Sequence, residues 1–162
     1  MEYRRSSTLR HATVEDAPLL LEIVQGAFSE YWGKLTPPSG SERETVGGIR
    51  NLLRFSDVVI AELAGEAVGC VFYTLNPDSL YFYRLSVLPA FRRQGIGRAL
   101  IAEMENIARN EGRTKVRLNV RVVLSNNREL YESLGYQVSG NRSHPGYSEP
   151  TFLDMEKNLG TD

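Results

Sequence analysis

The sequence predicts a single domain of the α/β class, in which a mixed β-sheet carries helices on its faces. Segments with the two-residue period of strands interleave along the chain with segments of helical period, and the predicted strands outnumber the helices. The 162 residues amount to about one domain, and no repeat, low-complexity segment or long linker divides them. We therefore expect one domain over residues 1–162.

The N-terminal half begins with a short predicted strand over residues 8–12. A helix follows to about residue 28, because its apolar residues share one wide face. Thr13 and Asp16 are its candidate caps, and Pro18 favours Asp16, since proline is tolerated in the first turn of a helix. The next predicted elements are a loop over 31–40, a short helix over 44–54, and a hairpin of strands 58–63 and 67–73 that turns at Gly65.

The C-terminal half is dominated by a long amphipathic helix, predicted over residues 95–111 because its apolar side chains fall on one stripe. The alternation of apolar and polar residues after this helix is typical of a strand with one buried face. The other predicted elements are a strand over 80–87 before the helix and, after it, a strand over 116–122, a short helix over 127–134 and two strands over 136–139 and 151–156.

Composition argues against several classes of protein. The formal net charge of −1 argues against general nucleic-acid binding. No apolar run is long enough to span a membrane, and the polar start Met1–Arg5 lacks the apolar stretch of a secretory signal. The one cysteine, Cys70, excludes an internal disulfide, fits a reducing compartment and lies among apolar residues, so we expect a core side chain. We therefore expect a cytoplasmic protein that binds neither nucleic acid nor membrane.

Residues 92–98, Arg-Arg-Gln-Gly-Ile-Gly-Arg, connect a predicted strand to the long helix. The first N–H groups of a helix have no partner within it and carry the positive end of its dipole, so they favour a phosphate. Gly95 and Gly97 let phosphate oxygens approach the backbone, and the arginines add charge. The turn opens a zone, residues 92–128, with nine basic and three acidic side chains. This zone favours a polyanionic small ligand, or else is a solvated charged face.

Two kinds of phosphate-binding loop are excluded. A P-loop ends in Gly-Lys-Ser/Thr, whereas Arg98 and Ala99 follow Gly97. A dinucleotide-binding loop needs a third glycine or alanine where Leu100 stands. A third pattern, Arg-x-x-Gly-x-Gly, is matched in full from Arg92 to Gly97.

This pattern resembles that of the GNAT N-acetyltransferases, in which a Val-x-Pro-like step ends a strand and Arg/Gln-x-x-Gly-x-Gly/Ala begins a helix. Val87-Leu88-Pro89 forms the step here, and a second motif of the family appears over residues 126–136 as Asn-Asn-Arg-Glu-Leu-Tyr-Glu-Ser-Leu-Gly-Tyr. The order of elements agrees over about residues 7–158, the expected core. The resemblance implies a mostly antiparallel, splayed sheet with about four helices, in which two strands part to admit the pantetheine arm of acetyl-CoA.

The resemblance also implies which residues bind the cofactor, and it implies no metal. Backbone groups of Leu85 and Val87 would bind pantetheine, those of residues 93–98 would bind the pyrophosphate, and the N–H of Leu85 would stabilise the oxyanion. The implied cofactor-binding residues are Leu85, Val87, Arg92, Arg93, Gln94, Gly95, Ile96, Gly97, Arg98, Asn127 and Tyr131.

Tyr131 stands where the family places a tyrosine beside the sulfur of coenzyme A, and a phenol has a proton to give at neutral pH. We expect it to act as the general acid that protonates the departing thiolate. The alternative is a packed ring whose hydroxyl makes a structural hydrogen bond. Asn126 or Asn127 caps the short helix that follows, or binds the arm of coenzyme A.

The general base is not evident from the sequence. Many members of the family carry a glutamate on the strand before the glycine turn, but residues 81–84 read Tyr-Phe-Tyr-Arg and contain no carboxylate. Glu30 and His144 are candidates, and a water chain near the Tyr83 hydroxyl is a third route. His144 also fits a surface residue of its loop.

The acceptor is expected to be a primary amine, of a small molecule or of a peptide or protein N-terminus. Tyr31 and Trp32 beside Glu30 favour a cationic amine, although Trp32 serves equally well as a packing anchor for the Pro37-Pro38 loop. The candidate substrate-contacting residues are Phe28, Glu30, Tyr31, Trp32, Tyr73, His144 and Tyr147.

The predicted function is therefore transfer of the acetyl group of acetyl-CoA to this amine by direct attack within a ternary complex. A non-catalytic acyl-CoA sensor or scaffold of the same fold is the alternative. Dimers are common in the family, so the resemblance leaves a homodimer open.

Overall fold

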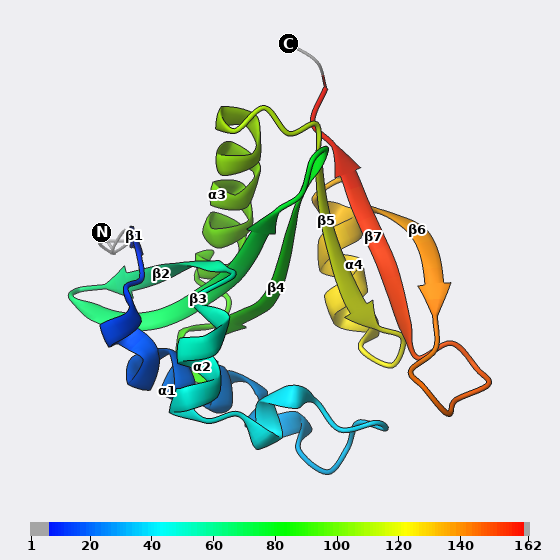
Figure 1. Cartoon of the computed structure of the whole chain (residues 1–162), viewed down its shortest axis with the longest axis horizontal. Helices are drawn as coiled ribbons and strands as arrows, with labels where there is room; N and C mark the ends of the chain where they lie inside the picture. The colour runs from blue at the N-terminus through cyan, green and yellow to red at the C-terminus, as the bar shows by residue number, and fades with distance from the viewer. Residues whose placement is uncertain (1–6, 161–162) are drawn as a thin grey trace. The chain divides into compact units, whose positions relative to one another are not determined.

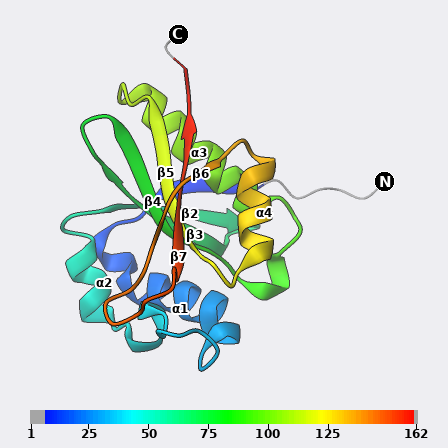
Figure 2. The same cartoon turned by 90° about the vertical axis from the view of Figure 1, so that its right-hand side faces the viewer.

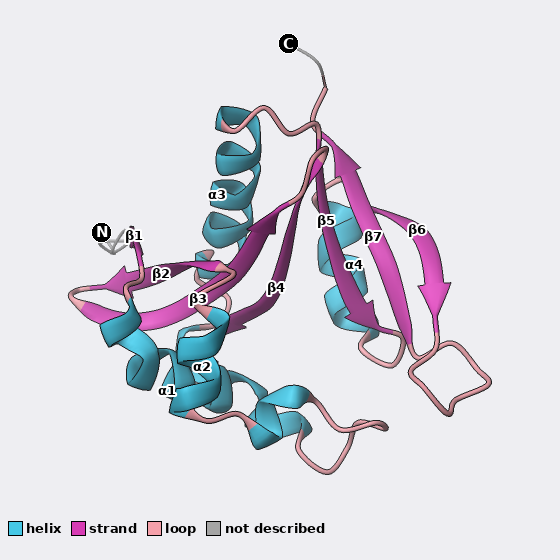
Figure 3. Cartoon of the chain, viewed as in Figure 1, coloured by secondary structure: helices cyan, strands magenta, loops and turns pink. Residues whose placement is uncertain are grey.

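The computed structural model describes residues 7–160, which form seven strands and four α-helices (Figures 1 and 3). The elements are β1 (Thr8–His11), α1 (Ala17–Phe28), α2 (Val46–Leu52), β2 (Asp57–Leu63), β3 (Glu66–Leu75), β4 (Ser79–Val87), α3 (Ile96–Asn110), β5 (Lys115–Arg121), α4 (Ser125–Ser133), β6 (Gln137–Arg142) and β7 (Phe152–Asn158). Met1–Arg5, on which the expectation about a secretory signal rested, lies outside the described residues.

The strands form one sheet in the order β1-β2-β3-β4-β5-β7-β6. The pairs β1–β2, β2–β3, β5–β7 and β6–β7 are antiparallel, and β4 pairs with β5 in parallel. This confirms the predicted fold class, a mixed and mostly antiparallel sheet with four helices. Within residues 7–160, no helix combines the length and the apolar character needed to cross a membrane.

Tertiary contacts group the chain into two compact units. The first comprises the described part of Met1–Thr74 together with Arg84–Glu103, and the second comprises Leu75–Tyr83 together with the described part of Met104–Asp162. Strand β4 and helix α3 each continue along the chain from one unit into the other. The organisation of residues 1–162 as one domain stays a prediction.

Helix α1 and strands β2 and β3 supply most of the core of the first unit. Four residues of the predicted apolar face of α1 are buried, Leu20, Ile23, Val24 and Ala27, together with Ala17, whereas Leu21 and Phe28 of that face are half-buried. The β2–β3 hairpin turns at Ala64 and Gly65, both with positive φ (53° and 80°), which confirms the turn predicted at Gly65. Cys70 is fully buried in β3, and burial raises its pKa to about 12, which confirms that it is a core residue.

Asp16 directly precedes α1, as predicted, but its carboxylate turns back toward the preceding strand. It accepts a hydrogen bond from the backbone N–H of Thr13 (2.8 Å) and pairs with Arg10 (2.9 Å). The hydrogen bond from Arg10 holds the pKa of this carboxyl below its usual value. Thr13 occupies the N-cap of a short 3-10 turn over Val14–Asp16, and Asp16 occupies the N-cap of α1 without a side-chain hydrogen bond to that helix.

In the second unit, the first part of β4 pairs with β5, and β7 lies between β5 and β6 (Figure 1). Helix α4 covers one face of these strands, as both views show (Figures 1 and 2). Three apolar positions of the predicted alternation, Val116, Leu118 and Val120, are buried in β5, whereas Val122 lies beyond the strand and is 41% exposed, so the alternation is confirmed only as far as Val120. Glu105 of α3, only 9% exposed, accepts hydrogen bonds from the Tyr136 hydroxyl (3.1 Å) and Lys157 Nζ (3.0 Å).

Helix α4 begins two residues earlier than predicted. Ser125 is its first residue and Leu124 occupies the N-cap, so the prediction that Asn126 or Asn127 caps the helix is wrong. Both asparagines lie in the first turn, where the N–H of Asn127 donates to the carbonyl of Leu124 (3.1 Å). Their polar side chains leave no hydrophobic period from which this turn could have been read.

Candidate functional site

The glycine turn, residues 92–95, is exposed where the chain passes from β4 to α3 in the first unit. Arg93 and Gly95 both have left-handed backbones (φ 63° and 84°), a geometry that turns successive N–H groups toward one side and creates sites for anions. A β-carbon on Gly95 would meet no atom within 4 Å, and one on Gly97 would meet only a methyl group of β4, at 3.8 Å. The backbone here is therefore open to a ligand.

The other predicted residues of this loop divide by exposure. The arginines and the glutamine face solvent, whereas Ile96 is 3% exposed and anchors the first turn of α3 in the core. The exposed side chains are those of Arg92, Arg93, Gln94 and Arg98. Leu85 and Val87, which the resemblance assigns to pantetheine through their backbones, are half-buried in β4.

Arg92 is held by acceptors of the first unit itself. Its Nη2 donates to the carbonyl of Ala27 (2.9 Å), its Nε donates to the carbonyl of Val87 (3.3 Å), and its Nη1 pairs with the carboxylate of Glu30 (2.5 Å). These contacts join the end of α1 to the end of β4, immediately before the turn. Glu30, one of the two candidate bases, thus lies beside the glycine turn as the partner of an arginine.

Arg84, the residue before Leu85 in β4, departs from the extended backbone of the strand. Its φ of 51° is strained for a residue that carries a β-carbon. Its guanidinium pairs with the carboxylate of Glu44, which precedes α2, and the two side chains are only 22% and 11% exposed. The Ser86 hydroxyl donates to the Arg84 carbonyl (2.9 Å). This ion pair thus ties the backbone next to Leu85 to the segment before α2.

Two glycines leave room for that ion pair. A β-carbon on Gly40 would lie 3.2 Å from Nη2 of Arg84, and one on Gly48 would lie 2.1 Å from Oε1 of Glu44. Residues 81–84 contain no carboxylate, and nothing in the sequence marks Glu44 as the partner of Arg84, because Glu44 is distant along the chain and belongs to another element. The glycine-rich start of α2 is the one local signal of a crowded neighbour.

Tyr131 belongs to an aromatic cluster of the second unit. Its ring lies 6.2 Å from that of Phe82 in β4 and 6.2 Å from that of Tyr136. Burial raises the pKa of the Tyr131 hydroxyl to about 12. Among residues 7–160, none forms a hydrogen bond with this hydroxyl, whereas that of Tyr136 donates to Glu105. The ring packs as the alternative interpretation required, but the structural hydrogen bond that it also required is not found.

His144, the other candidate base, lies between β6 and β7 in the second unit. Its Nδ1 and the Thr151 hydroxyl form a short hydrogen bond, and its backbone N–H donates to the same oxygen (2.9 Å). The ring of Tyr147, 39% exposed, lies 6.5 Å from the imidazole. Burial and, after it, the charge of Arg121 lower the pKa of His144, so the imidazole is neutral at physiological pH.

The remaining candidate substrate residues lie in the first unit. The rings of Phe28 and Tyr31 are 6.4 Å apart beside Glu30, and burial and the Glu30 charge raise the pKa of Tyr31. The indole N–H of Trp32 donates to Ser41 Oγ (3.4 Å), as a loop anchor does, while 39% of Trp32 stays exposed. Tyr73 is only 4% exposed, with its hydroxyl 3.2 Å from Nε2 of His11.

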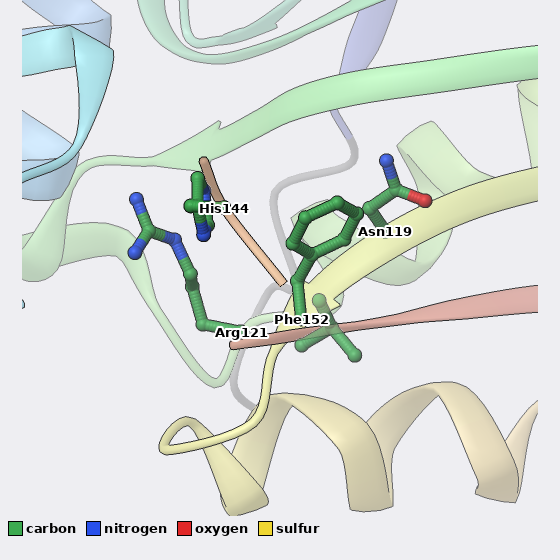
Figure 4. Close-up of a pocket in the computed structure, with 5 residues that line it drawn as sticks. Asn119, Arg121, His144 and Phe152 are labelled. Carbon is green, nitrogen blue, oxygen red and sulfur yellow. The ribbon is translucent and has the colours of Figure 1, made fainter. Parts of the chain in front are cut away.

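Within each unit, therefore, part of the predicted site comes together. The first unit gathers Glu30, Arg92 and the glycine turn, and the second gathers His144 and Tyr147, with Arg121, which was not a predicted site residue, beside His144 in the lining of a pocket (Figure 4). In the part of the chain that the structure describes, no group of three or more His, Cys, Asp or Glu side chains is placed to hold a metal ion.

Sequence comparison matches residues 54–138 to the family described as the acetyltransferase (GNAT) domain. The chain is 29% identical, over 132 residues, to the uncharacterized N-acetyltransferase CT2212 of Chlorobaculum tepidum; the match covers 80% of this chain and 74% of that protein. It is 36% identical over 93 residues to N-acetyltransferase 8 of Rattus norvegicus, which covers 54% of this chain and 42% of the relative.

Solved structures share the fold at low sequence identity. The PaiA N-acetyltransferase of Thermoplasma acidophilum, in complex with coenzyme A, superposes with a TM-score of 0.77 at 20% identity, covering 94% of this chain and 99% of its own. The ribosomal-protein-S18-alanine N-acetyltransferase of Escherichia coli gives 0.77 at 19% identity, covering 97% and 96%. A GNAT acetyltransferase of Elizabethkingia anophelis with acetyl-CoA bound gives 0.73 at 17%, covering 94% and 98%.

Proposed function

Because the chain belongs to the GNAT family of acetyltransferases, we propose that it transfers the acetyl group of acetyl-CoA to a primary amine. The observation that carries the proposal is the exposed turn before α3, where Arg93 and Gly95 are left-handed and no atom lies within 4 Å of the missing β-carbon of Gly95. Such a backbone suits a pyrophosphate. Two structures with the same fold contain coenzyme A or acetyl-CoA, which supports the same cosubstrate here.

In the proposed reaction, the neutral amine attacks the thioester carbonyl carbon directly, within a ternary complex. The N–H of Leu85 stabilises the oxyanion, the carbon–sulfur bond breaks, and Tyr131 gives a proton to the thiolate. The Tyr131 hydroxyl supports this role because it is protonated at neutral pH and forms no hydrogen bond within the described residues; its raised pKa makes it a weaker acid than an exposed tyrosine. The amine loses its proton to a base or to water.

Glu30 is the stronger candidate base of the two. Its carboxylate lies beside the glycine turn, whereas His144 already shares its Nδ1 with Thr151. Conversion of Glu30 to Gln should change the acid limb of the pH–rate profile, because a general base acts only when it is unprotonated, and conversion of His144 to Ala should leave both limbs in place.

Isothermal calorimetry with coenzyme A, followed by a thiol-release assay over a panel of amines, tests the proposal. We expect heat from coenzyme A and release of thiol with at least one primary amine. Heat without release from any amine would instead support an acyl-CoA sensor or scaffold. No heat from coenzyme A with a folded protein would end the proposal. The cytoplasmic location and a homodimer stay predictions.

A further inference from the structure

The peptide unit between Arg84 and Leu85 departs from the extended path of β4. Arg84 is left-handed (φ 51°), and a left-handed residue within a strand is typical of a β-bulge, in which one residue is left out of the hydrogen-bonded ladder. The N–H of this peptide unit belongs to Leu85, the oxyanion donor of the proposed reaction. The orientation of this one peptide unit therefore bears on the chemistry.

Ser86 and the neighbouring strand β3 confine this peptide unit. The buried Ser86 hydroxyl donates to the Arg84 carbonyl (2.9 Å). Because a peptide unit is planar, the direction of that carbonyl also sets the direction of the Leu85 N–H. A β-carbon on Gly69 of β3 would lie 2.8 Å from the Ser86 carbonyl oxygen, so β3 leaves little room for this part of β4 to shift.

Glu44 anchors the side chain of Arg84. One carboxylate oxygen of Glu44, Oε2, pairs with Nη1 of Arg84, and the other, Oε1, accepts a hydrogen bond from the backbone N–H of Thr45 (3.1 Å). The backbone carbonyl of Glu44 accepts a hydrogen bond from the side-chain amide of Gln25 in α1 (3.4 Å). Both charged side chains are mostly shielded from water, which strengthens their attraction. Glu44 is thus held by Thr45 and by α1, and it holds Arg84 in turn.

We propose that Glu44 is a positioning residue: through Arg84, it keeps the Leu85 N–H in the orientation that stabilises the oxyanion. The left-handed conformation is strained for a residue with a β-carbon, so without the ion pair Arg84 should relax toward the extended backbone of a strand. A donor to an oxyanion is effective because its direction is fixed before the reaction, so a relaxed peptide unit lowers the rate. The role in catalysis rests on the proposed function; the control of the Leu85 peptide unit does not.

The kinetic test replaces Glu44 by Gln. With the acceptor found in the amine panel, Glu44→Gln should lower kcat about tenfold or more, because a misdirected oxyanion donor stabilises the transition state less. Its affinity for coenzyme A should stay within about threefold by calorimetry, since coenzyme A has no acetyl carbonyl. The matched control is Glu62→Gln, the same change in the ion pair that Glu62 of β2 forms with Arg10 of β1, and its kcat should stay within about twofold of the native value.

Arg84→Gly added to Glu44→Gln separates positioning from stability. Glycine adopts a positive φ without strain, so the double variant should be more stable than Glu44→Gln in urea unfolding. Glycine also lets the peptide unit turn freely, so kcat should stay about tenfold or more below the native value. Native kcat in the double variant would overturn the proposal, and so would equal losses of kcat in Glu44→Gln and Glu62→Gln. A loss of coenzyme A affinity in Glu44→Gln as large as the loss of kcat would do the same, because Glu44 would then serve cofactor binding.

A measurement on the backbone tests the positioning without any turnover. In protein labelled with ¹⁵N-leucine, the Leu85 amide signal is identified by its loss in Leu85→Met, and NMR relaxation dispersion reports its microsecond-to-millisecond motion. We expect exchange at this amide in Glu44→Gln and in the double variant, and none in the native protein or in Glu62→Gln. A Leu85 amide as rigid in Glu44→Gln as in the native protein would overturn the proposal. Coenzyme A binding and thiol release test the proposed function separately, so the failure of one is distinguishable from the failure of the other.

Discussion

The Tyr131 hydroxyl is the side-chain group whose removal tests the proposed chemistry most directly. Tyr131→Phe keeps the ring contacts with Phe82 and Tyr136 and removes only the proton donor. We expect kcat to fall about tenfold to a hundredfold, at the lower end of general-acid effects because a thiolate is a good leaving group. Steady-state kinetics with the acceptor identified in the panel measures this.

Tyr136→Phe is the matched control for this variant. Its hydroxyl donates to the buried Glu105, so its removal should lower the free energy of unfolding by about 1–3 kcal/mol and leave kcat near the native value. If Tyr131→Phe were as active as the native protein, or if the two variants lost activity equally, Tyr131 would not be the acid.

His144 makes the stability of the protein depend on pH. Burial first, and then Arg121, lower its pKa below 6.5, and Thr151, Phe152 and Tyr147 are its other near neighbours. As the pH falls through 6.5 the unfolded chain takes up the proton before the folded one, so stability declines until the lowered pKa is passed. Urea unfolding at several pH values should show a smaller decline in His144→Gln. An identical decline in both proteins would contradict the lowered pKa.

At the level of single residues, the sequence predicted those that belong to a local motif and missed those defined by a distant partner. Tyr131 and the glycines of the turn were identified because the motif spacing is local. The pairing of Arg92 with Ala27 and Glu30, and that of Arg84 with Glu44, join segments that no periodicity relates. Such contacts become visible only once the chain is folded.

At the start of α3, the substitution Gly97→Ala tests ligand binding with little expected effect on stability. In Gly97→Ala the new β-carbon meets its nearest neighbour at 3.8 Å, an ordinary contact, and alanine favours the helix. We expect the free energy of unfolding to stay within about 1 kcal/mol of the native value. If the turn is the proposed pyrophosphate site, affinity for coenzyme A should fall about tenfold or more by calorimetry, because the β-carbon would occupy space that a phosphate oxygen needs.

Gly95→Ala should, in contrast to Gly97→Ala, lower the stability of the fold. At a φ of 84° the substitution should destabilise the fold by about 1 kcal/mol or more, whatever its effect on the ligand. If Gly97→Ala bound coenzyme A with native affinity, the turn would not be the pyrophosphate site.

The ion pair between Glu44 and Arg84 should support the strained backbone of β4. Glu44→Gln removes a mostly buried charge and should cost about 1–3 kcal/mol of unfolding free energy in urea titrations. Adding Arg84→Gly should restore about 1 kcal/mol, because glycine adopts a positive φ without strain and the unpaired guanidinium is gone. A double variant no more stable than Glu44→Gln would show that the backbone strain at Arg84 is negligible.

At the level of elements, the sequence predicted the helices and strands that carry a clear period. Two predictions differ more from the structure: the first turn of α4, where the polar residues Ser125–Asn127 carry no period, and β6, which was predicted over 136–139 and extends to Arg142. The left-handed break at Arg84 was also not predictable, since nothing in a Tyr-Arg-Leu sequence marks a positive φ.

For the whole molecule, the proposed cosubstrate should act as a stabiliser. A ligand that binds only the folded chain at about 100 times its Kd adds about 2.7 kcal/mol of stability. We expect coenzyme A and acetyl-CoA to raise the Tm in a thermal-shift assay, whereas ATP and NADP, which lack pantetheine, should raise it less. A larger shift with NADP than with coenzyme A would argue for a dinucleotide-binding protein.

The fold class was predictable at this scale because motif order and element order agreed along the chain. The acceptor was not predictable, because the candidate substrate residues come from segments that are distant in the sequence: residues 28–32, Tyr73 and the loop that carries His144 and Tyr147.

Glu105 couples the effects of substitutions at different positions of the second unit. Its carboxylate accepts hydrogen bonds from Tyr136, in the segment after α4, and from Lys157, in β7. Removing either donor leaves Glu105 with one hydrogen-bond partner. Removing Glu105 leaves both donors without their acceptor at once, the buried Tyr136 hydroxyl and the partly buried Lys157 ammonium. The energetic contributions of Tyr136 and Lys157 are therefore shared through a common acceptor, and the cost of removing both is not the sum of the separate costs.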